Sequence, residues 1–152
     1  MLCINLNNTD PYFCLAAEEF LLKNFTDDIF ILWQSSDTVV VGKHQNALAE
    51  IDYSFVKGNR INVARRISGG GAVFHDTGNL NFSFIKNVQS SAEIDFGIFT
   101  QPLINSFAKL NLKVTTSGYN NLLIEGRKIS GNAQHIYKKR VLHHGTLLYK
   151  SD

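Results

Sequence analysis

Cysteine and proline are scarce in this chain of 152 residues, which has two of each. Cys3 and Cys14 both lie near the start, and neither belongs to a CxxC pair or to a cysteine–histidine series with zinc spacing. We therefore expect no disulfide framework, and a reducing, cytoplasmic compartment fits the chain best. With so little proline, a proline-rich linker is excluded as well.

Charge of one sign and long apolar runs are also lacking. The 15 Lys and Arg residues outnumber the 13 Asp and Glu residues by only two, so the net charge is +2. This balance is too mild to predict nucleic-acid binding, which needs a basic patch or stripe. No apolar run approaches the ~20 residues that a membrane span needs. We therefore expect neither nucleic acid nor a membrane as a partner.

The remaining composition is that of an ordinary globular protein, with 44% hydrophobic and 18% charged residues. The first clear element is a predicted helix, which Asp10 can cap and for which Pro11 suits the first turn. Apolar residues at helical spacing predict its buried face, namely Phe13, Ala17, Phe20 and Leu21.

Strand patterns dominate the rest of the chain. The candidate strands are residues 29–34, 38–41, 61–67, 80–86, 122–125, 128–130 and 141–149. We expect the first two to form a hairpin, and the alternation in 80–86 predicts a half-buried strand. Helical patterns cover 47–57 and 94–110, and Pro102 is expected to kink the second helix or to begin its main body.

Short turns join most neighbouring strands, and long helical crossovers are few. This pattern favours an α+β domain with a mixed, mainly antiparallel sheet flanked by helices over a doubly wound fold.

The most informative stretch is residues 65–84, RRISGGGAVFHDTGNLNFSF. Three consecutive glycines at 69–71 are costly in a regular element, so they indicate either a tight turn or close approach of the backbone to a ligand. Free backbone N–H groups can bind an anion, and Arg65 and Arg66 suit phosphate or carboxylate. The spacing matches neither GxGxxG nor GxxxxGK[ST], so classical nucleotide loops are excluded. A plain turn and a phosphate cradle remain equally open.

Two later stretches carry further candidates. Lys128, on the glycine turn of EGRKISGNAQ, either binds an acyl phosphate or is simply solvated. In VLHHGTLLY, His143 and His144 are neighbours in a strand and point to opposite faces, so they cannot easily chelate one metal. His75 and Asp76 either act as a general base or hold a turn by a hydrogen bond. Trp33 is interpreted as a core residue.

Together, these stretches resemble the lipoate–protein ligase A family. The shared motifs are RRISGGGAVFHDTGNLNFSF, GRKISGNAQ and HHGTLL in this order, preceded by LAAEE and LWQSSDTVVVGKHQN. The resemblance implies the biotin/lipoate protein ligase fold. It also implies a two-step reaction, in which lipoate and ATP, with Mg²⁺ on the nucleotide, give lipoyl-AMP. A lysine of an acceptor lipoyl domain, of the E2 or the glycine-cleavage H type, then takes the lipoyl group.

The resemblance also assigns roles to residues. Lys128 is the expected catalytic residue and contacts both substrates. The nucleotide is expected to contact Arg66, Gly71, Ala72, Val73, Phe74 and Lys128. Lipoate is expected to contact Trp33, Arg66, Ser68, Gly70, His75 and Lys128. Weaker candidates are Asn79, His144 and Thr146. From chemistry alone, we add Trp33, Val41 and Val73 as walls of an apolar tunnel.

Family ligases continue well past HHGTLL, so we expect residues 1–152 to be a single, incomplete catalytic domain without an accessory domain. Two alternatives remain. A lipoyl or octanoyl transferase of the same fold holds its acyl group on a cysteine, and no cysteine follows Cys14. The other alternative is an incomplete module that binds lipoate or nucleotide without turnover.

Overall fold

A computed structural model describes residues 1–118 and 120–151; Tyr119 and Asp152, the last residue of the expected domain, lie outside the described residues. The first half contains β1 (Leu2–Asn5), α1 (Pro11–Asn24), β2 (Ile29–Trp33), β3 (Thr38–Val41), α2 (Ala47–Glu50), α3 (Tyr53–Gly58), β4 (Asn62–Arg65) and β5 (Val73–His75). The second half contains β6 (Asn79–Asn87), the 3₁₀ turn η1 (Ser91–Ile94), α4 (Phe96–Lys109), β7 (Val114–Ser117), β8 (Asn121–Ile124), β9 (Arg127–Tyr137) and β10 (Arg140–Leu148).

The strands form a large sheet and a small one. The large sheet has the order β1-β2-β6-β10-β9-β8-β7, and all its pairs are antiparallel except β1 with β2. The small sheet has the order β4-β3-β5, with β3 parallel to β4 and antiparallel to β5. The expected α+β fold with a mixed, mainly antiparallel sheet is confirmed.

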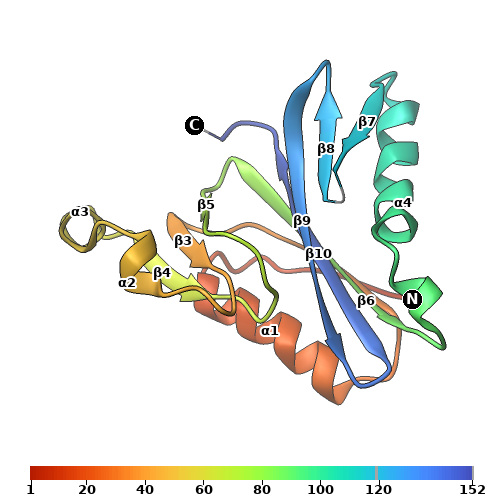
Figure 1. Cartoon of the computed structure of the whole chain (residues 1–152), viewed down its shortest axis with the longest axis horizontal. Helices are drawn as coiled ribbons and strands as arrows, with labels where there is room; N and C mark the ends of the chain where they lie inside the picture. The colour runs from red at the N-terminus through yellow and green to blue at the C-terminus, as the bar shows by residue number, and fades with distance from the viewer. Residues whose placement is uncertain (119, 152) are drawn as a thin grey trace.

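The helices α1 and α4 cover opposite faces of the large sheet (Figure 1). On the α1 face, Leu22 packs with Ile31 and Trp33. On the α4 face, Leu103 packs with Phe82 and Leu122. The small sheet lies on the α1 side, where the Tyr12 hydroxyl donates to the Val63 carbonyl at 3.2 Å. The large sheet is therefore covered on both faces, and a second layer of strands faces it beside α1.

Two expectations about strands were wrong. The β3 strand does not form a hairpin with β2. It pairs instead with β4 and β5 in the small sheet, and both of these partners lie later in the sequence, beyond α2 and α3. The β6 strand is not half-buried, since Asn81 and Ser83 are 2% and 0% exposed. These two polar side chains lie on the α1 face of a central strand, where layers on both sides exclude water.

The helices also differ from expectation. In α1, Phe13 and Phe20 are 51% and 58% exposed, while Cys14 and Glu18 are buried with Leu21. The buried face of α1 therefore differs from the predicted one, because the Glu18 side chain faces the sheet where a phenylalanine was expected. The segment 47–57 forms two short helices, since Asp52 caps a second one by accepting the Phe55 N–H. Pro102 lies inside α4 and does not begin it.

Among the described residues, each helix is too short or too polar to cross a lipid bilayer.

Candidate functional site

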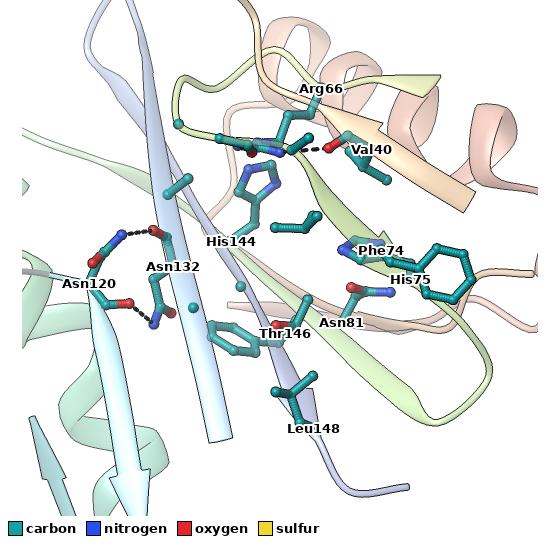
Figure 2. A pocket seen from close by; sticks show the side chains of 18 of the residues that line it. Val40, Arg66, Phe74, His75, Asn81, Asn120, Asn132, His144, Thr146 and Leu148 are labelled. Atoms are coloured by element: carbon teal, nitrogen blue, oxygen red, sulfur yellow. Dashed lines mark hydrogen bonds between the residues drawn. The ribbon is translucent and has the colours of Figure 1, made fainter. Parts of the chain in front are cut away.

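A cavity of about 520 Å³ lies between the α1 face of the large sheet and the small sheet (Figure 2). This volume lies within the range of small-molecule sites. The apolar residues of its wall include Leu15, Trp33, Val40, Ala72, Val73, Phe74, Phe82, Ala133 and Leu148. The polar side chains are Arg66, His75, Asn81, Asn120, Lys128, Asn132, His144 and Thr146. The cavity can therefore hold an apolar chain beside a polar or anionic group.

The cavity forms where the large sheet opens. The pairing of β10 with β9 ends at Gly145 and Asn132, whereas β10 stays paired with β6 as far as Leu148. Asn120 and Asn132 exchange side-chain-to-carbonyl hydrogen bonds of 3.3 and 3.0 Å on the β9 side of this opening (Figure 2). Gly145 is required here, because a Cβ atom would lie 2.5 Å from the Asn132 Oδ1 atom. The backbone of Gly145, without a side chain, thus lines the cavity at this point.

The glycine loop, residues 69–71, forms the opposite wall and is held by Arg66. The guanidinium Nη2 atom donates to the Gly69 and Gly71 carbonyls at 2.9 and 2.7 Å, and Nη1 donates to the Val40 carbonyl at 3.1 Å. Gly70 has φ of +101°, which favours glycine. Burial lowers the pKa of Arg66, and the Glu18 carboxylate opposes this effect. Arg66 therefore fixes the shape of the glycine loop through hydrogen bonds to its carbonyl groups.

Lys128 reaches the cavity because of a β-bulge. Leu122 is paired with Ser130, but the next residue, Leu123, is paired with Lys128, so Ile129 is the extra residue. Ile129 packs on the α4 side, and the break in alternation brings Lys128 to the face of Gly131. A Cβ atom on Gly131 would lie only 3.1 Å from the Lys128 Nζ atom, so the lysine crosses a position without a side chain.

His144 stands at the centre of a buried hydrogen-bond network. Its Nδ1 atom lies 3.0 Å from Oε2 of Glu18, and its Nε2 atom lies 2.6 Å from Oγ of Ser68. Ser83 donates to Glu18, and Trp33 Nε1 donates to Ser83 Oγ at 3.3 Å. The network joins α1, the centre of the large sheet and the start of the glycine loop.

His75 and Asn81 bring unpaired polar atoms to the same cavity. The Nδ1 atom of His75 and the Nδ2 atom of Asn81 are buried and have no hydrogen-bond partner among residues 1–118 and 120–151. Burial first, and then the neighbouring His144, lower the pKa of His75 to about 4. A neutral imidazole and an amide therefore face the cavity.

Asp76, next to His75 in the sequence, and His143, next to His144, have structural roles. Asp76 accepts the Gly78 N–H at 2.7 Å and the Ser151 hydroxyl at 3.1 Å, so the hydrogen-bonded turn, not a His–Asp base, is the interpretation that the geometry favours. His143 and His144 point to opposite faces of the sheet, as predicted: His143 lies on the α4 face and stacks on Phe99 with ring centroids 4.9 Å apart. Burial lowers the pKa of His143 to about 3.

The structure brings most of the predicted site residues together. The cavity wall includes Trp33, Arg66, Gly70, Gly71, Ala72, Val73, Phe74, His75, Lys128, His144 and Thr146. Ser68 and Asn79 are fully buried behind the wall, where Ser68 binds His144 and Asn79 Nδ2 donates to the Phe74 carbonyl at 3.2 Å. Val41 was the wrong choice for the tunnel, because strand alternation turns Val40 toward the cavity instead.

Sequence reasoning missed Glu18, Asn81 and the Asn120–Asn132 pair. Glu18 occupies the same helical stripe as Cys14 and Leu22, so a carboxylate on an apolar face was the available signal. Asn81 lay in an alternating strand pattern that predicted solvent exposure, and nothing in the sequence marked it as buried.

No thiol lies in the cavity wall as far as the structure describes it. Cys14 is packed against the sheet on α1, and burial, followed by the charges of Glu18 and Asp10, raises the pKa of its thiol to about 11. A protonated, buried thiol is a poor nucleophile.

A sequence model of the lipoyl protein ligase A/B catalytic domain matches residues 10–152. Lipoate–protein ligase 1 of Staphylococcus aureus (strain Mu50) is 41% identical over 150 residues, which are 97% of this chain and 46% of that protein. The lipoate-protein ligase LplJ of Bacillus subtilis (strain 168) is 42% identical over 149 residues, with 97% and 45% covered. The chain thus spans about half the length of the curated relatives that it matches.

Solved structures show the same fold. A bipartite lipoate protein ligase of Thermoplasma acidophilum, described with its E2 lipoyl domain, superposes with a TM-score of 0.93 at 29% identity, covering 99% of this chain and 62% of that one. A lipoate-protein ligase A bound with ATP has a TM-score of 0.90 at 26% identity, with 99% and 67% covered. The P. falciparum LipL1 in complex with lipoate has a TM-score of 0.83 at 34% identity, with 97% and 47% covered.

Proposed function

Because this chain belongs to the lipoyl protein ligase A/B catalytic domain family, we propose that it acts in ATP-dependent lipoylation. In the first step, a carboxylate oxygen of lipoate attacks the α-phosphorus of ATP, and pyrophosphate leaves. In the second step, the amine of a lysine on an acceptor lipoyl domain attacks the acyl carbonyl, and AMP leaves. The products are an amide and AMP. Acceptor domains of the E2 or the glycine-cleavage H type are the proposed partners.

One observation carries this proposal: the glycine loop and Lys128, which are more than 55 residues apart in the sequence, line one cavity. The reaction needs no nucleophile from the enzyme, because the substrate carboxylate and the partner's amine supply both attacks. It needs orientation of two reactants and stabilisation of negative charge on the α-phosphate. A backbone wall, a lysine and an apolar compartment provide these.

We assign the two substrates to different parts of the cavity. The acyl chain lies along the apolar side between Trp33, Leu15 and Val40, all of which line the cavity. The nucleotide lies along the glycine loop and β5, where Phe74 is 44% exposed and offers a face for stacking. Lys128 then lies where the carboxylate meets the α-phosphate and stabilises the charge on both.

Magnesium is expected with the triphosphate, where it neutralises phosphate oxygens. Within the described part of the chain, no three His, Cys, Asp or Glu side chains lie close enough to hold a metal ion. Phosphate oxygens of the nucleotide would therefore supply most of its ligands, as is common for Mg²⁺.

The test is a reaction of the protein with ATP, Mg²⁺, lipoate and a purified lipoyl domain, followed by intact mass spectrometry of that domain. We expect a mass increase of one lipoyl group that depends on ATP, and pyrophosphate release with lipoate alone. Transfer from a lipoyl or octanoyl thioester without ATP would favour the transferase. Calorimetric binding of lipoate and ATP without pyrophosphate release would favour the binding module.

A further inference from the structure

Glu18 is a carboxylate placed where carboxylates are costly. It lies on the α1 face that packs on the large sheet and is 1% exposed. A buried charge persists only when its oxygen atoms are hydrogen-bonded or paired. Glu18 meets this condition through His144 Nδ1, at 3.0 and 3.1 Å from its two oxygens, and through the Ser83 hydroxyl. The carboxylate is therefore fixed by two strands of the sheet.

The hydrogen bonds continue beyond His144 in one consistent direction. The carboxylate can only accept, so the Nδ1 atom of the imidazole carries the proton. When the ring carries this one proton, Nε2 accepts from the Ser68 hydroxyl at 2.6 Å. Ser68 Oγ in turn accepts the Nε–H of Arg66 at 3.1 Å.

Arg66 completes the connection to the cavity wall. The rest of its guanidinium binds the Gly69 and Gly71 carbonyls on the glycine loop. Glu18 and Arg66 are thus buried opposite charges, joined through one histidine and one serine. The order of the chain is Glu18, His144, Ser68, Arg66 and the glycine loop, and we call it the buried relay.

We propose that Glu18 is a positioning residue for this site: through the buried relay it fixes Arg66, and Arg66 fixes the glycine loop in the shape that lines the cavity. The inference rests on the proposed function for one point, namely that the loop receives the nucleotide. Glu18 touches no substrate in this proposal, and its effect on the loop passes through three other side chains.

The first test is Glu18→Gln, which keeps the shape of the side chain but removes the charge and one acceptor. The amide donates toward Ser83, whose hydroxyl must then turn and accept, or toward His144, so the charge-assisted hydrogen bonds of the relay are lost whichever way it turns. Since hydrogen bonds to charged groups are stronger than those between neutral groups, we expect the KM for ATP to rise about tenfold or more, with a smaller change in kcat. The matched control is Glu19→Gln, because Glu19 pairs with Lys23 on the exposed side of α1.

The second measurement does not depend on activity. In NMR spectra, the Arg66 Nε–H resonance and the amide resonances of the glycine loop should shift or broaden in Glu18→Gln and stay unchanged in Glu19→Gln. If Glu18→Gln does not fold, Ser83→Ala removes the hydroxyl that donates to Glu18, together with the acceptor of the Trp33 Nε1–H, and should produce the same changes at Arg66 and the glycine loop to a smaller extent.

A double-mutant cycle decides whether the relay acts as a unit. Glu18→Gln and Ser68→Ala act at opposite ends of His144, so their effects on the KM for ATP should be clearly non-additive. Additive effects, or spectra of Glu18→Gln that match those of Glu19→Gln at Arg66 and the glycine loop, would overturn the proposal. If the unaltered protein forms no lipoyl-AMP but Glu18→Gln still changes the NMR signals of Arg66 and the glycine loop, the proposed function fails and the relay stands. If the unaltered protein is fully active but Glu18→Gln leaves these signals unchanged, the proposed function stands and the relay fails.

Discussion

At the scale of single residues, the direction of the Lys128 side chain is set by two neighbours, Ile129 and Gly131. It is exposed, lies across Gly131 and lines the cavity because Ile129 interrupts the alternation of β9. Arg66 shows the opposite arrangement, since its donors are directed at carbonyls of the protein itself. Lys128 therefore remains available for a substrate, while Arg66 holds the wall.

We expect Lys128→Ala to abolish formation of lipoyl-AMP without unfolding the protein. The side chain is exposed, so its loss removes charge stabilisation in the transition state and little packing energy. Loss of one such electrostatic contact typically slows a reaction about 10²–10³-fold. Pyrophosphate release measures the effect, and Arg127→Ala, one residue earlier and outside the cavity wall, removes the same charge as a control. Release by Lys128→Ala at the normal rate would refute the assigned role.

Gly71→Val should abolish nucleotide binding while the fold persists. A Cβ atom on Gly71 meets no protein atom within 4 Å, so a branched side chain there points into open space at the cavity wall. It would block approach of a ligand to the backbone. Calorimetry with ATP measures the loss, and Gly58→Val, also free of contacts within 4 Å but located on α3, is the control. Unchanged affinity in Gly71→Val would reduce this glycine to a turn residue.

At the scale of elements, the glycine loop depends on the end of β3. Gly42 follows this strand, and its N–H is bonded to Gln45 while the Lys43 N–H donates to the Ser68 carbonyl at 2.9 Å. The backbones of Gly42 and Gly70 come so close that a Cβ atom on Gly42 would lie 2.1 Å from the Gly70 carbonyl oxygen. The segment after β3 and the glycine loop therefore contact each other here through their backbones.

Gly42→Ala should accordingly lower the free energy of unfolding by about 1–3 kcal/mol, the usual range for overpacking. It should also weaken ATP binding, because the glycine loop must move away from the new methyl group. Urea denaturation and calorimetry measure the two effects. Gly58→Ala is the control, with free space around it and a position on a helix where alanine is favoured. Equal stability of Gly42→Ala and the unaltered protein would show that the loops separate at no cost.

At the scale of the whole molecule, the layers keep two histidines uncharged. His75 lies at the cavity and His143 on the α4 face, where Gln134 and Asn132 bind its two ring nitrogens at 2.9 and 3.1 Å. Burial is the largest cause that lowers the pKa of each, to about 4 and about 3. Folding therefore disfavours their protonation.

This predicts the sign of the pH dependence of stability. Below about pH 6.5, the unfolded chain binds protons on both histidines, whereas the folded protein does not until about pH 4 or 3. Their contribution is complete above about pH 6.5 and is lost as the pH falls toward 4. Each histidine contributes at most about 1.4 kcal/mol per pH unit in that window.

Urea denaturation of the unaltered protein and of His143→Gln at a series of pH values measures this contribution. The variant should lose stability less steeply between pH 6 and pH 4, and the two curves should run parallel near pH 8. Equal slopes in the acidic range would contradict the neutral, buried state of His143.

The sequence by itself determined the fold class, the positions of most strands and the identity of the glycine and lysine motifs. These features are local: alternation, turn residues and motif spacing are properties of short segments, and so the strands β2, β6 and β10 were found close to their observed bounds. Motif order was enough to place the chain in its family.

Only the tertiary structure decided which strands pair, which polar residues are buried and which motif residues face the cavity. The β3 strand pairs with β4 and β5 rather than with its sequence neighbour β2. Glu18 is buried because His144, 126 residues later, forms hydrogen bonds with its carboxylate. Ser68 lies behind the wall through the same kind of distant hydrogen bond, to His144, whereas Asn79 is bonded to the Phe74 carbonyl nearby in the sequence. Burial depends on which layers meet, and layers form from contacts between residues that no local pattern connects.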